Sequence, residues 1–298
     1  MSYSGIICID KPAGFTSFDV IAKMRGILRT KKLGHSGTLD PMATGVLPVF
    51  AGSATKAVDM LSDHDKTYSA GFRLGYRSDT QDITGDMIPS GQMIPDTEAV
   101  CRATASFVGD IMQIPPMYSA VSVNGKRLYQ LAREGREIER EARPVTVYSS
   151  ELTSYDFASG EGTIDVCCSK GTYIRTLIND IGESLGCGGV LSSLRRIKAC
   201  GFDITECVTL DKLQEMADRD EDMSSLFYRV EKVFEDLPVI QLDRHQTSLY
   251  RNGVKLSDDV IGMKSGSLYR VHDDTGSFIS IAVHDAQNGI VRVRKNFF

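Results

Sequence analysis

Paired cysteines, metal-binding clusters and long apolar runs are all missing from this chain of 298 residues. The seven cysteines form no C-x-x-C pair, and an odd count without paired spacing predicts reduced thiols rather than a disulfide framework. Reduced thiols are typical of the cytoplasm, so we expect the protein to act there. The five histidines are scattered, without an H-E-x-x-H motif or a Cys/His cluster, which speaks against a structural or catalytic zinc ion.

Apolar stretches are short along the whole chain. The N-terminal apolar run covers only residues 6–9 and is followed by Asp10 and Lys11, so it is too short for a signal peptide. No run approaches the roughly 20 apolar residues that a membrane-spanning helix needs. We therefore expect no membrane partner. The length exceeds that of one compact core and suits two domains.

The net charge of −5 taken alone argues against a nucleic-acid partner, but the charge is unevenly distributed. Residues 203–238 hold 11 acidic and four basic side chains, so the rest of the chain carries 30 basic and 28 acidic ones. Within that remainder, basic residues cluster at positions 23–32, 126–143 and 195–198. Local patches of positive charge attract a phosphate backbone whatever the net charge is. Solvated helix faces are the competing interpretation of each cluster taken alone.

The segment GHSGTLDPMATGVLP, residues 34–48, places a single carboxylate in a restrained loop. Its three glycines allow backbone angles that other residues avoid, and Pro41 pushes Asp40 toward extended geometry. No other acidic residue occurs from Val20 to Leu39. We predict a rigid loop that presents Asp40 as one reactive group. The competing interpretation is a turn residue whose carboxylate accepts hydrogen bonds from loop N–H groups.

Local patterns predict the elements of a larger N-terminal domain. Thr16 and Asp19 form a capping-box pattern, and apolar residues then recur at helical spacing as far as Leu28. Ser53 is expected to cap a second helix that ends near Leu61. The other predicted elements are strands at 5–10, 47–51, 66–76, 145–157 and 162–168, and helices at 97–107 and 172–185.

A charged region interrupts this pattern. Residues 118–123 are predicted to form a strand, and Asn124-Gly125 then marks a tight turn. Residues 126–144 are expected to be helical or loop-like. The charge and the glycines of the segment 110–145 suit a mobile segment that orders on binding a partner.

The chain changes character at about residue 238. Short alternating runs at 268–272, 278–284 and 290–294 are joined by hairpin signals, which predicts a small all-β domain of about 60 residues. The expected division is therefore a first domain at 1–237, which contains the charged segment 110–145, and a second domain at 238–298.

The Asp40 segment and several others, taken in order, resemble the TruB family, the tRNA pseudouridine-55 synthases of the bacterial stand-alone type. The resemblance covers the chain from Gly5 to Lys198. One departure is Val190, in a stretch where the family often has a histidine. The segments are DKPAGFTS, KKLGHSGTLDPMATGVLP, GSATK, DKTY, RSDTQDITG, QIPPMYSA, NGKRLYQLAREG, REARPVTVY, CSKGTYIRTL, LGCGG and LRR.

The resemblance implies a fold and an activity. The fold is α+β, with a mixed and mainly antiparallel sheet flanked by helices, followed by a small β-barrel-like domain of the PUA type. The activity is the isomerisation of uridine 55 to pseudouridine in the TΨC arm of tRNA, without a cofactor or a metal. The implied partner is the T-arm stem-loop of tRNA, with no required protein partner. The domain at 1–237 is then the catalytic domain, the segment 110–145 is its RNA-binding insertion, which we expect to close on the RNA, and 238–298 is a PUA-like RNA-binding domain. Nothing in the sequence indicates oligomerisation, so a monomer is the default expectation.

The resemblance also implies roles for eight residues. Asp40 matches the family's indispensable aspartate, Arg175 the arginine beside it, and Tyr68 the tyrosine that stacks on the base and is a candidate proton acceptor. Substrate-binding residues are expected at His35, Tyr173, Leu194, Lys11 and Lys56. A carboxylate can serve as a nucleophile or assist a glycal-type intermediate, and both routes stay open. A uridine inside a folded tRNA arm must be flipped out to reach such a site.

Each of these residues has a simpler interpretation without the family. Tyr68 and Leu194 would be core residues, Tyr173 and Arg175 would begin a helix, and His35 would be a loop histidine. Two other functions also remain open: a tRNA chaperone with incidental catalysis, and a guide-dependent relative that modifies ribosomal RNA with protein partners.

Overall fold

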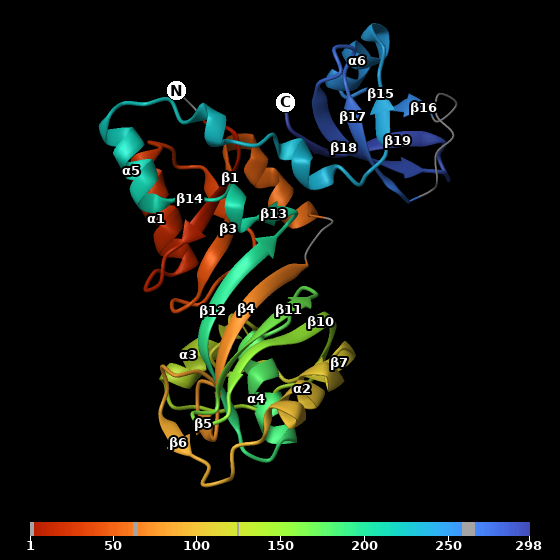
Figure 1. The fold of residues 1–298 in the computed structure, drawn as a ribbon. Helices are drawn as coiled ribbons and strands as arrows, with labels where there is room; N and C mark the ends of the chain where they lie inside the picture. The colour runs from red at the N-terminus through yellow and green to blue at the C-terminus, as the bar shows by residue number, and fades with distance from the viewer. Residues whose placement is uncertain (1–2, 62–64, 124, 258–265) are drawn as a thin grey trace.

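A ten-stranded mixed sheet runs through the larger part of the protein, and most of its strand pairs are antiparallel (Figure 1). The computed structural model describes residues 3–61, 65–123, 125–257 and 266–298. The strand order is β14-β1-β3-β12-β4-β11-β10-β7, with β2 beside β3 and β13 beside β12. The strands are β1 (Gly5–Lys11), β2 (Leu33–His35), β3 (Thr44–Ala51), β4 (Lys66–Leu74), β7 (Gly109–Gln113), β10 (Arg143–Asp156), β11 (Glu161–Cys168), β12 (Gly189–Ala199), β13 (Phe202–Asp203) and β14 (Val208–Thr209).

The sheet consists of two halves that meet at a short parallel contact between β3 and β12. Only two residue pairs form this contact, Arg195 with Thr44 and Arg196 with Gly45. Gly45 has a φ of +100°, and a Cβ atom there would lie 2.1 Å from the carbonyl oxygen of Arg196. Glycine is therefore required for the two halves to approach so closely. The loop that carries Asp40 ends at this contact.

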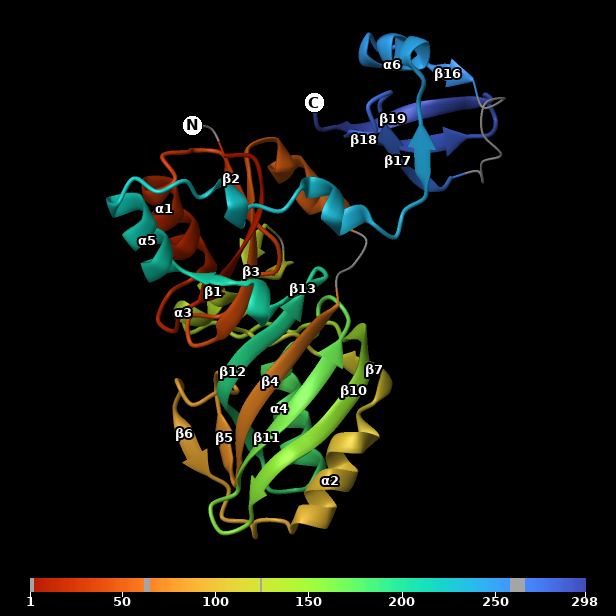
Figure 2. The ribbon, with the colours of Figure 1, turned by 45° about the horizontal axis from the view of Figure 1, so that its top comes forward.

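Each half of the sheet has its own helices, and the two sets of helices lie on either side of the contact between β3 and β12 (Figure 2). Helices α1 (Ser17–Ile27) and α5 (Leu210–Asp218) pack together and share a core with β1 and β3. Helix α4 (Ile174–Ser184) packs on β12 and β4, and α2 (Thr97–Ser106) packs on β10. The predicted α+β class, with a mixed and mainly antiparallel sheet, is confirmed.

Most local predictions for this domain are confirmed. Thr16 caps α1, and both hydrogen bonds of its capping box with Asp19 are present. The predicted strands at 145–157 and 162–168 are β10 and β11, which pair antiparallel. The prediction at Ser53 is wrong: a 3₁₀ helix, η1 (Gly52–Met60), begins after Ala51 with no side-chain cap. Its tighter turns follow directly from the end of β3.

Residues 114–142 form a small unit at the end of β7, which we call the insertion. It contains β8 (Ser122–Val123), β9 (Lys126–Arg127) and α3 (Leu128–Arg133). Strands β8 and β9 pair antiparallel on either side of the predicted turn, of which Asn124 lies outside the described residues. The insertion has its own core of Met117, Leu128 and Leu131. The predicted segment 110–145 also takes in parts of β7 and β10, which belong to the main sheet.

The C-terminal part forms a second, five-stranded sheet in the order β15-β17-β18-β19-β16. The predicted strands at 268–272, 278–284 and 290–294 are confirmed. The expectation of an all-β domain is wrong in one respect, because helix α6 (Arg244–Arg251) is present; Asp243 caps it. The strands are β15 (Val239–Gln241), β16 (Leu256–Ser257), β17 (Leu268–His272), β18 (Phe278–Asp285) and β19 (Ile290–Asn296).

The second sheet packs against the first domain through an aromatic cluster. The ring of Phe234, in the 3₁₀ helix η4 (Val230–Phe234), lies 6.2 Å from that of Phe278 and 6.0 Å from that of Phe297. Ile281 of β18 is fully buried in the same core as residues of β1 and β3. Among the described helices, none has the length and apolar character to cross a membrane.

Candidate active site

The backbone on both sides of Asp40 is held by buried side chains from other elements. The ammonium group of Lys11 is completely buried and donates hydrogen bonds to the carbonyl oxygens of Pro12 at 2.9 Å, Phe15 at 2.5 Å and Pro41 at 3.3 Å. Burial lowers the pKa of Lys11 to about 8, although the charge of Asp40 opposes this shift. Lys11 therefore connects the residue after Asp40 to the start of α1.

The residue before Asp40 is fixed in a similar way. The hydroxyl of Ser17 accepts a hydrogen bond from the N–H of Leu39 at 2.9 Å and donates one to its carbonyl at 3.3 Å. Further back, Nη2 of Arg196 donates to the carbonyl of Gly37 at 2.9 Å. Three side chains from β1, α1 and β12 thus fix the loop that carries Asp40, which confirms the predicted restraint.

Arg175 joins Asp40 to two other parts of the chain. Its Nε lies 3.0 Å from Oδ2 of Asp40, and its Nη1 lies 3.6 Å from Oδ2 of the buried Asp82. The remaining donors are used by backbone carbonyls, with Nη1 3.1 Å from that of Thr80 and Nη2 2.8 Å from that of Tyr118. The side chain of Arg175 is only 5% exposed, whereas that of Asp40 is 40% exposed. The guanidinium group is therefore immobilised, and the carboxylate faces open space.

Opposing effects set the pKa of Asp40. Burial raises the pKa of Asp40, and the negative charge of Asp82 raises it further. The positive charges of Arg175 and Lys11 lower it, and the net direction is upward. A partly desolvated carboxylate beside a fixed guanidinium has the two properties that nucleophilic or proton-transfer chemistry requires.

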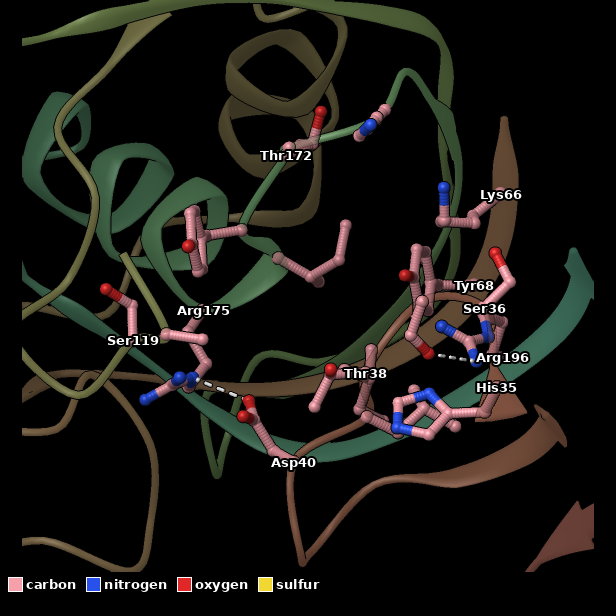
Figure 3. Close-up of a pocket in the computed structure, with 18 of the residues that line it drawn as sticks. His35, Ser36, Thr38, Asp40, Lys66, Tyr68, Ser119, Thr172, Arg175 and Arg196 are labelled. Atoms are coloured by element: carbon pink, nitrogen blue, oxygen red, sulfur yellow. Dashed lines mark hydrogen bonds and ion pairs between the residues drawn. The ribbon is translucent and has the colours of Figure 1, made fainter. Parts of the chain in front are cut away.

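A cavity of about 590 Å³ opens beside Asp40 (Figure 3). Tyr68 from β4, Leu194 from β12 and Tyr173 at the start of α4 contribute its aromatic and apolar walls. His35 and Thr38 line the side formed by the Asp40 loop. Such a cavity, with an apolar wall and a charged pair at one edge, suits a flat polar ring.

Two further pKa shifts define the polarity of this cavity. Burial raises the pKa of Tyr68, and the positive charge of Arg196 opposes the shift, so the phenol is protonated at neutral pH. Burial and the charge of Arg196 both lower the pKa of His35, so its ring is neutral. These states favour a stacking role for Tyr68 and contacts by His35 that do not involve charge.

Six of the eight residues singled out in the sequence lie together around this cavity: Asp40, Arg175, Tyr68, Tyr173, Leu194 and His35. Lys11 and Lys56 do not line it. Lys11 lies behind the loop, as described above, and Nζ of Lys56 donates to the carbonyl of Asn296 in β19 at 2.8 Å. The two lysines therefore support the loop and the junction with the second sheet in the free protein.

Sequence reasoning missed two charged residues at the site. Arg196 was grouped with Arg195 and Lys198 as a basic cluster on a solvated helix face, but all three lie on strand β12. Arg196 is completely buried, with Nε 2.7 Å from the carbonyl of Val46, and Arg195 is paired with Asp10 at 2.8 Å. This expectation is therefore corrected, because a strand between two others buries every second side chain.

Asp82 was also missed, although its segment was noted. It lies in RSDTQDITG, and its carboxylate accepts hydrogen bonds from the hydroxyls of Thr80 at 2.8 Å and Thr84 at 2.5 Å. The surrounding threonines were a usable signal for a buried, hydrogen-bonded carboxylate. Within the described residues, no group of three His, Cys, Asp or Glu side chains is arranged to hold a metal ion.

Comparisons with known proteins agree with this geometry. The family model described as "TruB family pseudouridylate synthase (N terminal domain)" matches residues 25–174, and "tRNA pseudouridylate synthase B C-terminal domain" matches residues 175–237. The chain is 40% identical to tRNA pseudouridine synthase B of Clostridium perfringens, with 95% of each chain covered. It is 42% identical to that of Saccharophagus degradans, with 94% of this chain and 91% of the relative covered.

Solved structures extend the comparison to the fold. A chain in the crystal structure of a Cbf5-Nop10-Gar1 complex superimposes with a TM-score of 0.75 at 27% identity, covering 99% of this chain and 85% of the other. A chain in the archaeal box H/ACA sRNP Nop10-Cbf5 complex gives 0.73 at 26% identity, covering 99% and 86%. The main sheet thus has the pseudouridine synthase fold, and the curled second sheet fits the expected PUA-like domain.

Proposed function

The chain belongs to the TruB family of pseudouridylate synthases, which are isomerases, and from this membership we propose that it converts uridine 55 of tRNA to pseudouridine. The relatives at about 40% identity are tRNA pseudouridine synthases and cover nearly the whole chain, which supports tRNA as the substrate. The observation that carries the proposal is Asp40, held 3.0 Å from the buried Arg175 at the edge of a cavity with aromatic walls.

The reaction moves one bond and one proton. The N1–C1′ bond of the uridine breaks, the uracil turns, a C5–C1′ bond forms, and the proton on C5 is lost while N1 gains one. No atom is added or removed, so neither an oxidant nor a cofactor enters the balance. The catalytic groups must therefore stabilise a detached base and a reactive sugar in one enclosed site.

Asp40 is proposed as the catalytic carboxylate. As a nucleophile it would attack the sugar or the base, and in a glycal route it would stabilise and deprotonate the intermediate. Both routes need the ionised form, which Arg175 and Lys11 favour and which burial and Asp82 oppose. The hydrogen bonds around residues 37–41 support this role, because a fixed carboxylate loses little freedom on reaching its target.

The walls of the cavity are proposed to hold the flipped base. Tyr68 would stack on it, while Tyr173 and Leu194 would enclose it and His35 would contact the RNA loop. Tyr68 is also a candidate acceptor for the proton lost from C5, but the raised pKa of Tyr68 supports stacking as its main role. Lys11 and Lys56 would act behind this surface rather than as direct contacts, which their present hydrogen bonds support.

Other surfaces would bind the rest of the tRNA. The insertion, with exposed Arg127 and Arg133, is proposed to close on the T-arm, and the domain from residue 238 to bind RNA as a PUA-like module. Shape and phosphate contacts would dominate this recognition. We further propose that the protein works as a monomer without protein partners, in the cytoplasm where its substrate occurs.

Tritium release from C5-labelled uridine in a bare T-arm stem-loop tests the proposal. The purified wild type should release tritium, and Asp40→Asn should reduce the rate by at least about 10⁴-fold. A wild type that is inactive on the bare stem-loop, and active only with a guide RNA and protein partners, would favour the guide-dependent function. Isomerisation that persists in Asp40→Asn would show that the catalytic assignment of Asp40 is wrong.

A further inference from the structure

Ser119 is a buried polar side chain beside the cavity, and the function proposed above gives it no role. It is 5% exposed, and its hydroxyl has no hydrogen-bond partner among the residues that the structure describes. Buried hydroxyl groups nearly always have a partner, because an unpaired one is costly. An unpaired hydroxyl at the edge of a binding cavity therefore indicates a partner supplied by the ligand.

The backbone around Ser119 is firmly held. The carbonyl of Tyr118 accepts a hydrogen bond from Nη2 of Arg175 at 2.8 Å, and the carbonyl of Ser119 accepts one from the N–H of Tyr129 at 3.1 Å. Upstream, the side-chain amide of Gln113 bonds both the N–H and the carbonyl of Tyr173, at 2.8 and 3.1 Å. The motif QIPPMYSA thus fixes two residues of the cavity and holds the backbone of Ser119 in place.

The position of Ser119 relative to Asp40 suggests what that partner is. Both residues line the cavity described above and a second cavity of about 730 Å³, whose lining includes Asp82 and Arg127. Tyr68 lines only the first cavity. In Figure 3, Ser119 and Tyr68 lie on opposite sides of Asp40. Ser119, like Asp40 and Arg175, therefore lies where the two cavities meet.

A uridine that reacts at Asp40 would span this boundary. With the base stacked on Tyr68 and C1′ at the carboxylate, the rest of the ribose extends away from Tyr68, toward Ser119. The 2′-hydroxyl is attached to the carbon next to C1′, and it can both donate and accept a hydrogen bond. It therefore matches the unpaired hydroxyl of Ser119 in reach and in chemistry.

We propose that Ser119 forms a hydrogen bond with the 2′-hydroxyl of the nucleotide that is isomerised, and so selects ribose over deoxyribose in the site. This inference rests on the proposed function, since it requires a uridine in the cavity. The motif QIPPMYSA would then have two roles. It positions Tyr173 and Arg175, and its Ser119 binds the substrate.

A four-way binding comparison tests this contact directly. Affinities are measured in the Asp40→Asn background, where the RNA is not converted, with Ser119 or Ser119→Ala and with uridine or 2′-deoxyuridine at the target position. Either change alone should weaken binding about three- to tenfold, as expected for one neutral hydrogen bond, and both together should weaken it no further. If the two effects multiply, or if Ser119→Ala binds like its parent, the inference is wrong.

Activity and stability provide a second measurement. Ser119→Ala, with Asp40 intact, should slow single-turnover isomerisation without lowering the melting temperature, because the hydroxyl makes no hydrogen bond with any residue that the structure describes. Ser122→Ala is the matched control, since its hydroxyl lies in the same insertion and bonds the carbonyl of Lys126 at 3.3 Å. A clear loss of melting temperature in Ser119→Ala would indicate a structural role instead. An inactive wild type would contradict the proposed function, whereas an unaffected Ser119→Ala would contradict this inference alone.

Discussion

The Asp40 loop, residues 36–43, and the insertion, residues 114–142, both border the cavity but are held in different ways. Buried side chains of β1, α1 and β12 bond the backbone of the loop from three directions. The insertion has a core of three buried apolar side chains and is bonded to Arg175 through the carbonyl of Tyr118. The loop is thus part of the main domain, whereas the insertion is a small unit attached to it.

This difference indicates that the Asp40 loop and the insertion have different tasks. A reacting carboxylate must be held in place, because a displacement of about 1 Å lowers the reaction rate strongly. A segment with few buried contacts opens at low cost, which suits a surface that must admit and then enclose a large RNA. Substitutions in the loop should therefore change the rate, and substitutions in the insertion should change RNA affinity.

After Asp40 itself, the largest effect is expected at Arg175, which contacts both regions. Arg175→Lys keeps the charge, but an ammonium group cannot reach Asp40, Thr80 and Tyr118 from the positions of three guanidinium nitrogens. The single-turnover rate should fall by about 10²–10³-fold. Arg77→Lys is the control, because Arg77 forms a two-point contact with Glu183 on the surface of the same domain. Equal rates for the two variants would show that charge alone suffices beside Asp40.

Lys11→Met should give a smaller effect that depends on pH. The positive charge of Lys11 lowers the pKa of Asp40, so its removal should raise that pKa and leave less of the ionised form at low pH. The rate should fall about tenfold near pH 8 and further near pH 6, measured as single-turnover rates from pH 5 to 9. Lys23→Met, which removes a partly buried lysine of α1 that pairs with Asp211 at 3.6 Å, should leave the profile unchanged. An unshifted acidic limb in Lys11→Met would contradict the electrostatic part of this account.

The sequence could predict those parts of the structure that depend on residues close together in the chain. The capping box at Thr16 and the alternation along β10 and β11 depend on residues a few positions apart, and both are confirmed. The position of Arg196 depends on the pairing of β12 with β3, which joins residues about 150 positions apart. No local pattern encodes such a contact, so a buried arginine was interpreted as a surface one.

At the site too, contacts between residues far apart in the chain could not be predicted from the sequence. Family motifs located Asp40, Arg175 and Tyr68, and the structure brings them to one cavity. The same motifs could not show that Lys11 lies behind the loop or that Asp82 faces Arg175, because those contacts follow from packing between elements. Motifs therefore identify which residues matter more readily than they show what each one touches.

Two glycines offer a direct comparison of the regions, with a smaller expected effect. Gly37 in the loop has a φ of +70° and Gly135 in the insertion has a φ of +68°, so alanine causes similar backbone strain, about 1 kcal/mol, at both positions. A Cβ atom at Gly37 would lie 3.2 Å from Nη1 of Arg196, whereas one at Gly135 would have nothing within 4 Å. Gly37→Ala should therefore lower the melting temperature more and slow isomerisation about tenfold.

The outcome distinguishes packing from backbone strain. If Gly135→Ala slows the reaction as much as Gly37→Ala while RNA binding is unchanged, the insertion is as important for the chemistry as the loop. That result would remove the division of tasks. If both variants differ from the wild type only in stability, then the loop tolerates small displacements, and its hydrogen bonds matter mainly for folding.

The smallest effect is expected from the charges of the insertion. Arg127 and Arg133 are exposed and line the second cavity, so the double variant Arg127→Gln and Arg133→Gln should bind the T-arm about three- to tenfold more weakly. The slope of log affinity against log salt should decrease by about 1–2, one for each lost phosphate contact. The single-turnover rate at saturating RNA should not change, because neither residue lines the first cavity. Arg219→Gln, within the acidic region, is the control. A lower rate at saturating RNA would mean that the insertion helps to arrange the reacting groups, and closure would then be a catalytic step rather than a binding step.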